Sequence, residues 1–254
     1  IQEISKTEVE ALIREAHASG KKVEILPSKL VCTVKPGPNG GRRKVRWVIC
    51  GNFEEQKAED TFSSGADAAA FRILVTAASF FQWVGGTIDV KTAFLNADMK
   101  MSSPDEVLLI RPPPITLEKK YFTPGTCYLP LKEEYGLRRS PRLWGDCRDE
   151  FLVEVEVKLE GEGTVLHLSQ LESEPNLWRI EEPPKEEGVT SPLRGLLMTY
   201  VDDIFVAAEE EVSAAVIEAI RQKWKTSEPD VVGEKHIRFL GMEVTKVKNQ
   251  ETGR

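Results

Sequence analysis

Three aspartates are the residues of this 254-residue chain best placed to do chemistry. Asp202 and Asp203 stand between two short apolar runs, and Asp89 interrupts the apolar run TIDVKTAFL. Burying a carboxylate is costly unless something pairs with it, so Asp89 needs a cation, and a hard divalent ion is a natural one. Carboxylates on two strands of one sheet can hold two Mg²⁺ about 3.5 to 4 Å apart, as in phosphoryl displacement. Alone this signal is weak, because an Asp-Asp turn is usually just a solvated hairpin.

The segments around Asp202 and Asp203 predict the elements that must hold them. RGLLMTY and IFVAA are apolar runs on either side of a polar turn, which indicates a β-hairpin. Behind it, Val212, Val216, Ile220 and Trp224 are each four residues apart, so we expect a helix from about Glu209 to Lys225 on a sheet. HIRFLGMEV is expected to form one more strand.

The remaining patterns predict a mixture of hairpins and helices. We expect a polar helix over residues 3–18 ended by Gly20, and then a hairpin of LVCTV and RRKVRWVIC around the turn PGPNGG. A loop over residues 54–66 is expected to lead to a buried helix from about Ala68 to Trp83, which is followed by a break at Gly85-Gly86. Further along, we expect a rigid connector at residues 112–114 and a partly solvated acidic insertion within residues 150–190. Regular βαβ alternation is missing, so the fold class is predicted to be α+β.

Composition limits the classes of function. Lys and Arg total 34 against 41 Asp and Glu, a net charge of −7, so nucleic acid would have to bind at local basic patches, of which residues 42–46 are the densest. No apolar run approaches the length of a membrane span. The four cysteines form no C-x-x-C pair, which indicates reduced, mostly buried thiols in an intracellular protein. The first residues lack an initiator Met and a signal peptide, so we interpret the chain as a fragment of something longer.

Five collinear segments resemble the reverse transcriptases of Ty1/copia-type LTR retrotransposons. They are KVRWVICGNF (44–53), IDVKTAFLNADM (88–99), EYGLRRSPRLW (134–144), TYVDDIFVAA (199–208) and FLGMEV (239–244). Several spaced motifs in one order are far more specific than any one of them.

The resemblance implies a two-metal site for nucleotidyl transfer. Asp89, Asp202 and Asp203 would be its catalytic carboxylates and, with the Val90 carbonyl, would bind two Mg²⁺, for which Mn²⁺ can substitute. The reaction would be template-directed DNA synthesis, in which a primer 3′-OH attacks the α-phosphorus of a dNTP.

Four further residues are implied to contact the nucleotide. Lys44 and Arg46 match basic positions that bind the triphosphate, and Phe94 matches an aromatic gate that excludes a ribose 2′-OH. Arg139 stands where the family usually has a Gln near the nucleotide, which puts nucleotide handling in doubt. The alternative interpretations are a solvated basic strand and, for Phe94, a core aromatic.

The remaining implied contacts are with primer and template. They involve Tyr200, Arg142 and the segment Phe239-Leu240-Gly241, which resembles a strand that supports the primer end. An apolar run with Gly there could equally be a bulged core strand.

The resemblance also implies the layout of a right-hand polymerase, with an antiparallel palm sheet backed by helices. Residues 1–22 would be a helical lead-in, 23–85 and 103–140 the fingers, and 86–102 and 141–254 the palm, with thumb and RNase H elsewhere in the polyprotein. The implied partners are a primed RNA or DNA template, dNTP and other Pol segments, with no membrane. The implied location is intracellular, in cytoplasmic virus-like particles and in the nucleus. Two rivals remain: a decayed or domesticated nucleic-acid-binding remnant, and another palm enzyme such as a nucleotide cyclase.

Overall fold

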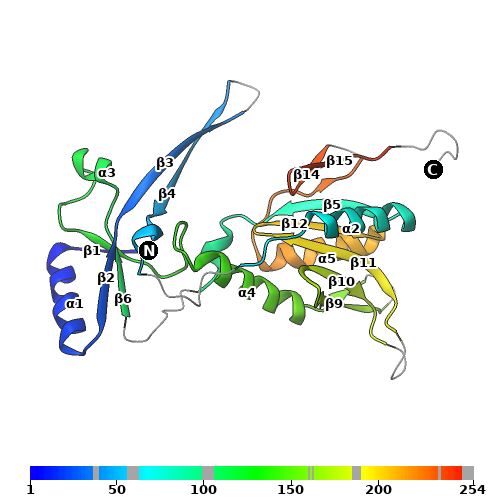
Figure 1. Ribbon diagram of the computed structural model, residues 1–254, viewed down its shortest axis with the longest axis horizontal. Coiled ribbons are helices and arrows are strands. Elements are labelled where there is room, and N and C mark those ends of the chain that lie inside the picture. Colours follow the sequence, from blue (N-terminus) through cyan, green and yellow to red (C-terminus); the bar gives the residue numbers. More distant parts are fainter. Residues whose placement is uncertain are drawn as a thin grey trace. The chain divides into compact units, whose positions relative to one another are not determined.

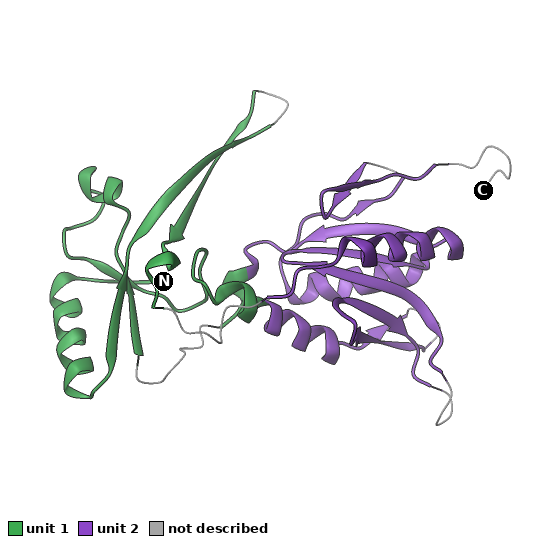
Figure 2. Cartoon of the chain, in the orientation of Figure 1, with its two compact units in different colours: residues 1–62, 94–144 green, residues 63–93, 145–254 purple. Residues whose placement is uncertain are grey.

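The chain folds into two compact units. The computed structural model describes residues 1–36, 40–55, 63–98, 106–159, 161, 163–184, 190–233 and 236–247. Unit 1 consists of residues 1–62 and 94–144, and unit 2 of residues 63–93 and 145–254 (Figure 2). The described residues form five α-helices and several sheets (Figure 1), which confirms the mixed helix and strand content expected from the sequence. The labels fingers and palm, with their bounds, stay predictions.

Unit 1 contains a four-stranded sheet of order β1-β7-β6-β2 and a separate hairpin, β3-β4. Strands β2 and β6 are parallel, and the other pairs are antiparallel. Its elements are β1 (Gln2–Ile4), α1 (Lys6–Ala18), β2 (Lys22–Leu26), β3 (Ser28–Lys35), β4 (Arg42–Ile49), the 3₁₀ turns η1 (Gly51–Phe53) and η2 (Ala93–Asn96), β6 (Glu106–Ile110), α3 (Pro114–Glu118), β7 (Cys127–Leu129) and the start of α4 (Ser140–Glu154). The expected hairpin is confirmed, although residues 37–39 of its turn lie outside the described residues.

The first helix begins later than the sequence pattern indicated. Ser5 caps it: its hydroxyl accepts from the Glu8 amide, and the Glu8 carboxylate accepts from the Ser5 amide in return. Residues before this cap are drawn into β1, which pairs with β7. Helix α1 therefore begins at Lys6, and the expectation of a helix from residue 3 was wrong.

Unit 2 contains a seven-stranded sheet of order β13-β5-β12-β11-β10-β9-β8, with helices on both faces, and a separate two-stranded sheet, β14-β15. Its elements are α2 (Ala68–Phe81), β5 (Val84–Asp89), most of α4, β8 (Val157–Lys158), β9 (Val165–Leu171), β10 (Glu174–Glu181), β11 (Leu193–Tyr200), β12 (Asp203–Ala208), α5 (Glu210–Lys223), β13 (Asp230–Val231), β14 (Ile237–Phe239) and β15 (Met242–Val244).

Helices α2 and α5 cover opposite faces of this sheet. On α2, Phe71 and Leu74 are buried in a cluster with Phe205 of β12. On α5 the predicted stripe of Val212, Val216 and Ile220 is buried, which confirms that helix. In β5, a Cβ on Gly85 would meet Phe205 and one on Gly86 would approach Ile217 of α5, as expected when successive residues point to opposite faces.

The sequence pattern had indicated a break between elements at Gly85-Gly86, and this expectation was wrong. Both glycines lie inside β5, paired with Ala207 and Val206 of β12. A Cβ on Gly85 would come within 3.0 Å of the Phe205 and Val232 side chains, so glycine allows close packing inside the strand. Strand β5 then ends at Asp89 rather than running through it.

The acidic region 150–190 contains more regular structure than its sequence pattern indicated. It contributes β8, β9 and β10 to the sheet and buries Leu166, Leu168 and Trp178; residues 160, 162 and 185–189 lie outside the described part. The expectation that HIRFLGMEV forms one strand was wrong. It forms two strands, because Leu240 and Gly241 have positive φ and reverse the chain.

The four cysteines are free thiols. The expectation that most of them are buried was wrong: Cys127 is buried, Cys50 and Cys147 are partly exposed, and Cys32 lies on the exposed surface of the β3-β4 hairpin.

Candidate active site

Three carboxylates meet at one end of the unit 2 sheet. Strands β5 and β12 pair so that Asp89 lies opposite Asp203. Asp202 follows Val201, whose φ of 54° marks the tight turn between β11 and β12. One carboxylate oxygen from each of Asp89, Asp202 and Asp203 lies within 4.8 Å of the others, and all three residues are partly buried.

Backbone hydrogen bonds connect the strands at this point. The Val90 amide donates to the Asp202 carbonyl at 2.8 Å, which joins the end of β5 to the turn. Val90 itself is fully buried and forms an isolated bridge with Thr226. Two hydrogen bonds join Asp89 to Ser227. The Asp89 amide donates to the Ser227 hydroxyl at 3.0 Å, and the Ser227 amide donates to the Asp89 carbonyl at 2.8 Å.

The three carboxylates repel one another, and a bound cation would relieve this repulsion. Burial raises the pKa of Asp203 to about 6, and the neighbouring charges of Asp202 and Asp89 raise it further in the same direction. Three partly buried carboxylates that repel each other form a donor set of hard oxygens, which suits Mg²⁺ or Mn²⁺. The residues present therefore fit the divalent ions that the resemblance of the sequence implied.

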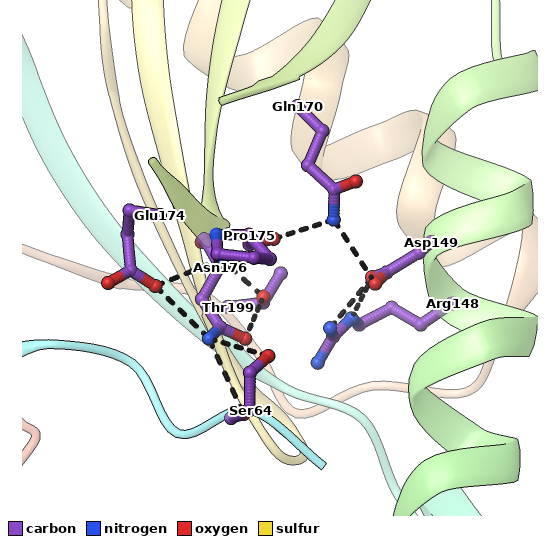
Figure 3. A network of polar contacts seen from close by, with 8 residues as sticks. All are labelled: Ser64, Arg148, Asp149, Gln170, Glu174, Pro175, Asn176 and Thr199. Atoms are coloured by element: carbon purple, nitrogen blue, oxygen red, sulfur yellow. Dashed lines mark hydrogen bonds and ion pairs between the residues drawn. The ribbon is translucent and has the colours of Figure 1, made fainter. Parts of the chain in front are cut away.

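A polar network lies beneath the hairpin that carries Asp202 and Asp203 (Figure 3). The Thr199 hydroxyl, fully buried on β11, donates to the Asn176 side-chain oxygen on β10 at 3.4 Å. The Asn176 amide group donates to the Ser64 hydroxyl at 3.2 Å and to the Glu174 carboxylate at 3.2 Å. The network thus connects the segment before α2 to the two strands behind the turn.

A second set of polar contacts in Figure 3 joins α4 to the strands β9 and β10. Arg148 donates to the Asp149 carboxylate at 2.7 Å, and the Gln170 amide group donates to the same carboxylate and to the Pro175 carbonyl. Burial raises the pKa of Asp149, against the opposing effect of Arg148. These contacts fix α4 on the sheet.

Phe94 lies in unit 1, in the turn η2. Its ring is partly buried and meets the Tyr135 ring edge-on, with 5.0 Å between the centroids. Tyr135 belongs to the EYGL segment, whose backbone is bonded to the end of β4. Two segments of the sequence resemblance, one containing Phe94 and one containing Tyr135, therefore touch through their aromatic rings.

Lys44 and Arg46 share one face of the β3-β4 hairpin. Lys44 is opposite Thr33 and Arg46 opposite Val31, and both cations are partly exposed. Arg42, opposite Lys35, has the same parity as these two residues, whereas Arg43 lies on the other face. The hairpin thus carries a basic face in unit 1.

Arg139 is buried, with 7% of its surface exposed. Its Nε lies 3.2 Å from the carboxylate of Glu133, which is fully buried and also accepts from the Ser140 hydroxyl. Burial raises the pKa of Glu133, and the positive charge of Arg139 opposes that shift. The guanidinium that replaces the family's Gln is therefore engaged in an ion pair within unit 1.

The residues predicted to contact primer and template are distributed over both units. Tyr200 is exposed at the end of β11, and Arg142 is partly exposed on the first turn of α4. Phe239 is a core residue that packs on Phe71 and Phe205. Leu240 and Gly241 form the turn of the β14-β15 hairpin. Phe239 thus holds this hairpin to the sheet.

Sequence reasoning missed three supporting polar residues. Ser227 is 138 positions from Asp89, and nothing in TSEPD marks it as a partner. Asn176 and Glu133 lie in segments rich in polar residues, where a buried side chain gives no distinct signal. The spacing of apolar residues finds faces of elements, and it does not find the polar side chains that connect them.

Comparison with known protein families gives a match. A family model described as reverse transcriptase (RNA-dependent DNA polymerase) matches residues 17–169, more than half of the chain. The matched part includes Asp89 and Phe94 and ends before Asp202. No curated protein matches the chain. Among the described residues, no helix is long and apolar enough to cross a membrane.

Proposed function

Because the chain belongs to the reverse transcriptase (RNA-dependent DNA polymerase) family, we propose that it is the polymerase segment of a Ty1/copia-type LTR retrotransposon. The observation that carries this proposal is the meeting of Asp89, Asp202 and Asp203 within 4.8 Å. Carboxylates so close together favour bound divalent cations, which polymerases need.

The reaction is template-directed extension of a primer. A bond forms between the primer 3′ oxygen and the α-phosphorus of the dNTP, and the bond to the leaving pyrophosphate breaks. Mg²⁺ ions bound here would stabilise the negative charge that develops on the attacking and leaving oxygens. Asp89, Asp202 and Asp203, with the Val90 carbonyl, would hold them.

The other predicted residues bind and select the substrate. Lys44 and Arg46 bind the triphosphate with their positive charges, and Phe94, backed by Tyr135, excludes a 2′-OH from the sugar site. Arg139 acts through its ion pair with Glu133, which holds the EYGLRRS segment in place. Tyr200, Arg142 and the β14-β15 hairpin face primer and template.

We also propose a layout, partners and a location for the protein. Residues 86–102 and 141–254 make up the palm and 23–85 and 103–140 the fingers, although α2 packs on the unit 2 sheet. The partners are a primed template, dNTP and other Pol segments, without a membrane. The protein works in cytoplasmic virus-like particles and in the nucleus.

Asp202→Asn tests this proposal. The substitution keeps the shape of the side chain and removes its charge, so Mg²⁺-dependent primer extension by the full-length protein should be lost while primer-template binding is kept. Glu210→Gln, an equivalent change in the exposed first turn of α5, is the control and should leave extension unchanged. Unchanged extension by Asp202→Asn contradicts the metal role, and a wild-type protein that binds duplex without extending it supports the decayed or domesticated remnant.

A further inference from the structure

Ser227 holds both backbone groups of Asp89. Its hydroxyl accepts a hydrogen bond from the Asp89 amide at 3.0 Å, and its amide donates to the Asp89 carbonyl at 2.8 Å. These two contacts form a closed pair on the flank of β5 that faces away from β12. The backbone of one predicted metal ligand is thus fixed by a single residue 138 positions later in the chain.

The pairing on this flank contains one extra residue. Asp230 of β13 lies opposite Thr87, whereas Thr226 lies opposite Val90. Residues 227–229 therefore face only residues 88 and 89, which is a β-bulge. Bulges redirect side chains and are frequent beside active sites. Here the bulge brings the Ser227 hydroxyl to a position that a strand carbonyl would otherwise occupy.

The sequence of the bulge fits this arrangement. Pro229 has no amide hydrogen, so it suits an irregular position where no ladder bond is made. On either side the pairing is regular: Val232 donates to Gly85, and Lys91 donates to Lys225. The irregular pairing is therefore confined to the stretch beside Asp89.

We propose that Ser227 is a positioning residue that sets the affinity of the carboxylate cluster for divalent cations. The inference rests on the metal-binding part of the proposed function. With the amide and carbonyl of Asp89 held, the carboxylate leaves the strand end in one direction, beside Asp203 and the turn. Without the hydroxyl, the strand end gains freedom, and the three oxygens are no longer held at the spacing that a shared cation requires.

The experiment measures Mn²⁺ binding by the full-length protein, from the electron paramagnetic resonance signal of free Mn²⁺, without nucleic acid or dNTP. Ser227→Ala removes the acceptor, and Ser227→Cys replaces it with a poor acceptor of similar size. Both should weaken Mn²⁺ binding by roughly tenfold. Ser227→Thr keeps a hydroxyl and should bind close to wild type.

The control separates positioning from general packing. Ser213→Ala removes a buried serine hydroxyl on α5, a more enclosed position than that of Ser227, and should leave Mn²⁺ affinity unchanged. Melting curves in EDTA identify variants that have lost their fold, and Ser227→Cys stands in if Ser227→Ala is one of them. Wild-type Mn²⁺ affinity in a folded Ser227→Ala or Ser227→Cys variant overturns the inference.

Primer extension measured in parallel separates this inference from the proposed function. If Ser227 only positions the ligand, the variants need more Mg²⁺ for half-maximal extension and reach nearly the wild-type rate at saturation. A wild-type protein that binds Mn²⁺ but extends no primer contradicts the proposed function, while the affinity series still supports the role of Ser227. A wild-type protein that binds no Mn²⁺ overturns both.

Discussion

Asp203 is the residue at which the cost of assembling the carboxylate cluster is most evident. Its pKa lies at about 6 in the folded protein against an ordinary value of 3.8, because burial and then the charges of Asp202 and Asp89 disfavour ionisation. Between these two pH values the folded chain binds more protons than the unfolded chain, so stability falls as the pH rises through this window. Above pH 6 the full electrostatic cost is present.

Asp203→Asn should therefore stabilise the metal-free protein. At pH 8 in EDTA we expect an increase of about 1 kcal/mol in the free energy of unfolding, since a pKa unit corresponds to about 1.4 kcal/mol and solvent screens a half-buried group. Urea denaturation at pH 8 and pH 5 measures this increase in unfolding free energy, which should be smaller at pH 5. In saturating Mg²⁺ the wild type should become the more stable of the two proteins, because only the wild type has all three carboxylate ligands. Equal stabilities at pH 8 in EDTA contradict the prediction.

At the scale of elements, two glycines allow the EYGLRRS segment to lie against the end of β4. Gly136 has a φ of +100°, and a Cβ there would lie 2.0 Å from the Ile49 carbonyl oxygen. A Cβ on Gly51 would lie 2.2 Å from the Gly136 oxygen, to which the Gly51 amide donates. The glycine of this sequence motif is thus explained by backbone packing in unit 1.

Gly136→Ala should destabilise unit 1 strongly. The methyl group would collide with backbone atoms in a conformation that L-residues rarely adopt, so we expect a loss of about 2 kcal/mol or more in unfolding free energy. Gly145→Ala is the matched control, because that glycine lies in α4 with no atom within 4 Å of its Cβ position, and alanine there should stabilise by roughly 0.5 to 1 kcal/mol. Thermal denaturation of both variants measures the difference, and similar melting temperatures would show that the segment can move aside.

Elements with a clear apolar period could be predicted from the sequence. The stripe of Val212, Val216 and Ile220 on α5 and the two runs around Asp202 gave the right helix and hairpin. Strands β9 and β10 were missed because they are short apolar runs within a region whose composition is dominated by acidic residues. Gly85 and Gly86 were interpreted as a break because the sequence does not show that Phe205 and Val232 press against them.

The candidate site shows the same limit. The three aspartates could be identified from their types, their apolar surroundings and the resemblance. Ser227 could not, since its contact depends on an extra residue in the pairing of β13 with β5. Arg139 was expected near the nucleotide, but its burial depends on Glu133, a pairing that tertiary structure creates.

At the scale of the whole molecule, the net charge disfavours the binding of polyanions. The chain carries a net charge of −7, so a nucleotide or nucleic acid approaches a molecule of its own sign. Attraction must then come from local surfaces. The β3-β4 register gathers such a surface by placing Lys44 and Arg46 on one face and Arg43 on the other.

Lys44→Ala combined with Arg46→Ala should raise the KM for dNTP roughly tenfold at low salt, because two cations that contact phosphate are lost. The difference in KM between the double variant and the wild type should become smaller as salt is added, since the screening length falls from about 30 Å at 0.01 M to about 8 Å at 0.15 M. Arg43→Ala removes the same kind of charge from the opposite face of the hairpin and controls for net charge. If only the total charge mattered, Arg43→Ala would raise KM about half as much on a logarithmic scale as the double variant. A much smaller effect of Arg43→Ala instead assigns triphosphate binding to the face that carries Lys44 and Arg46.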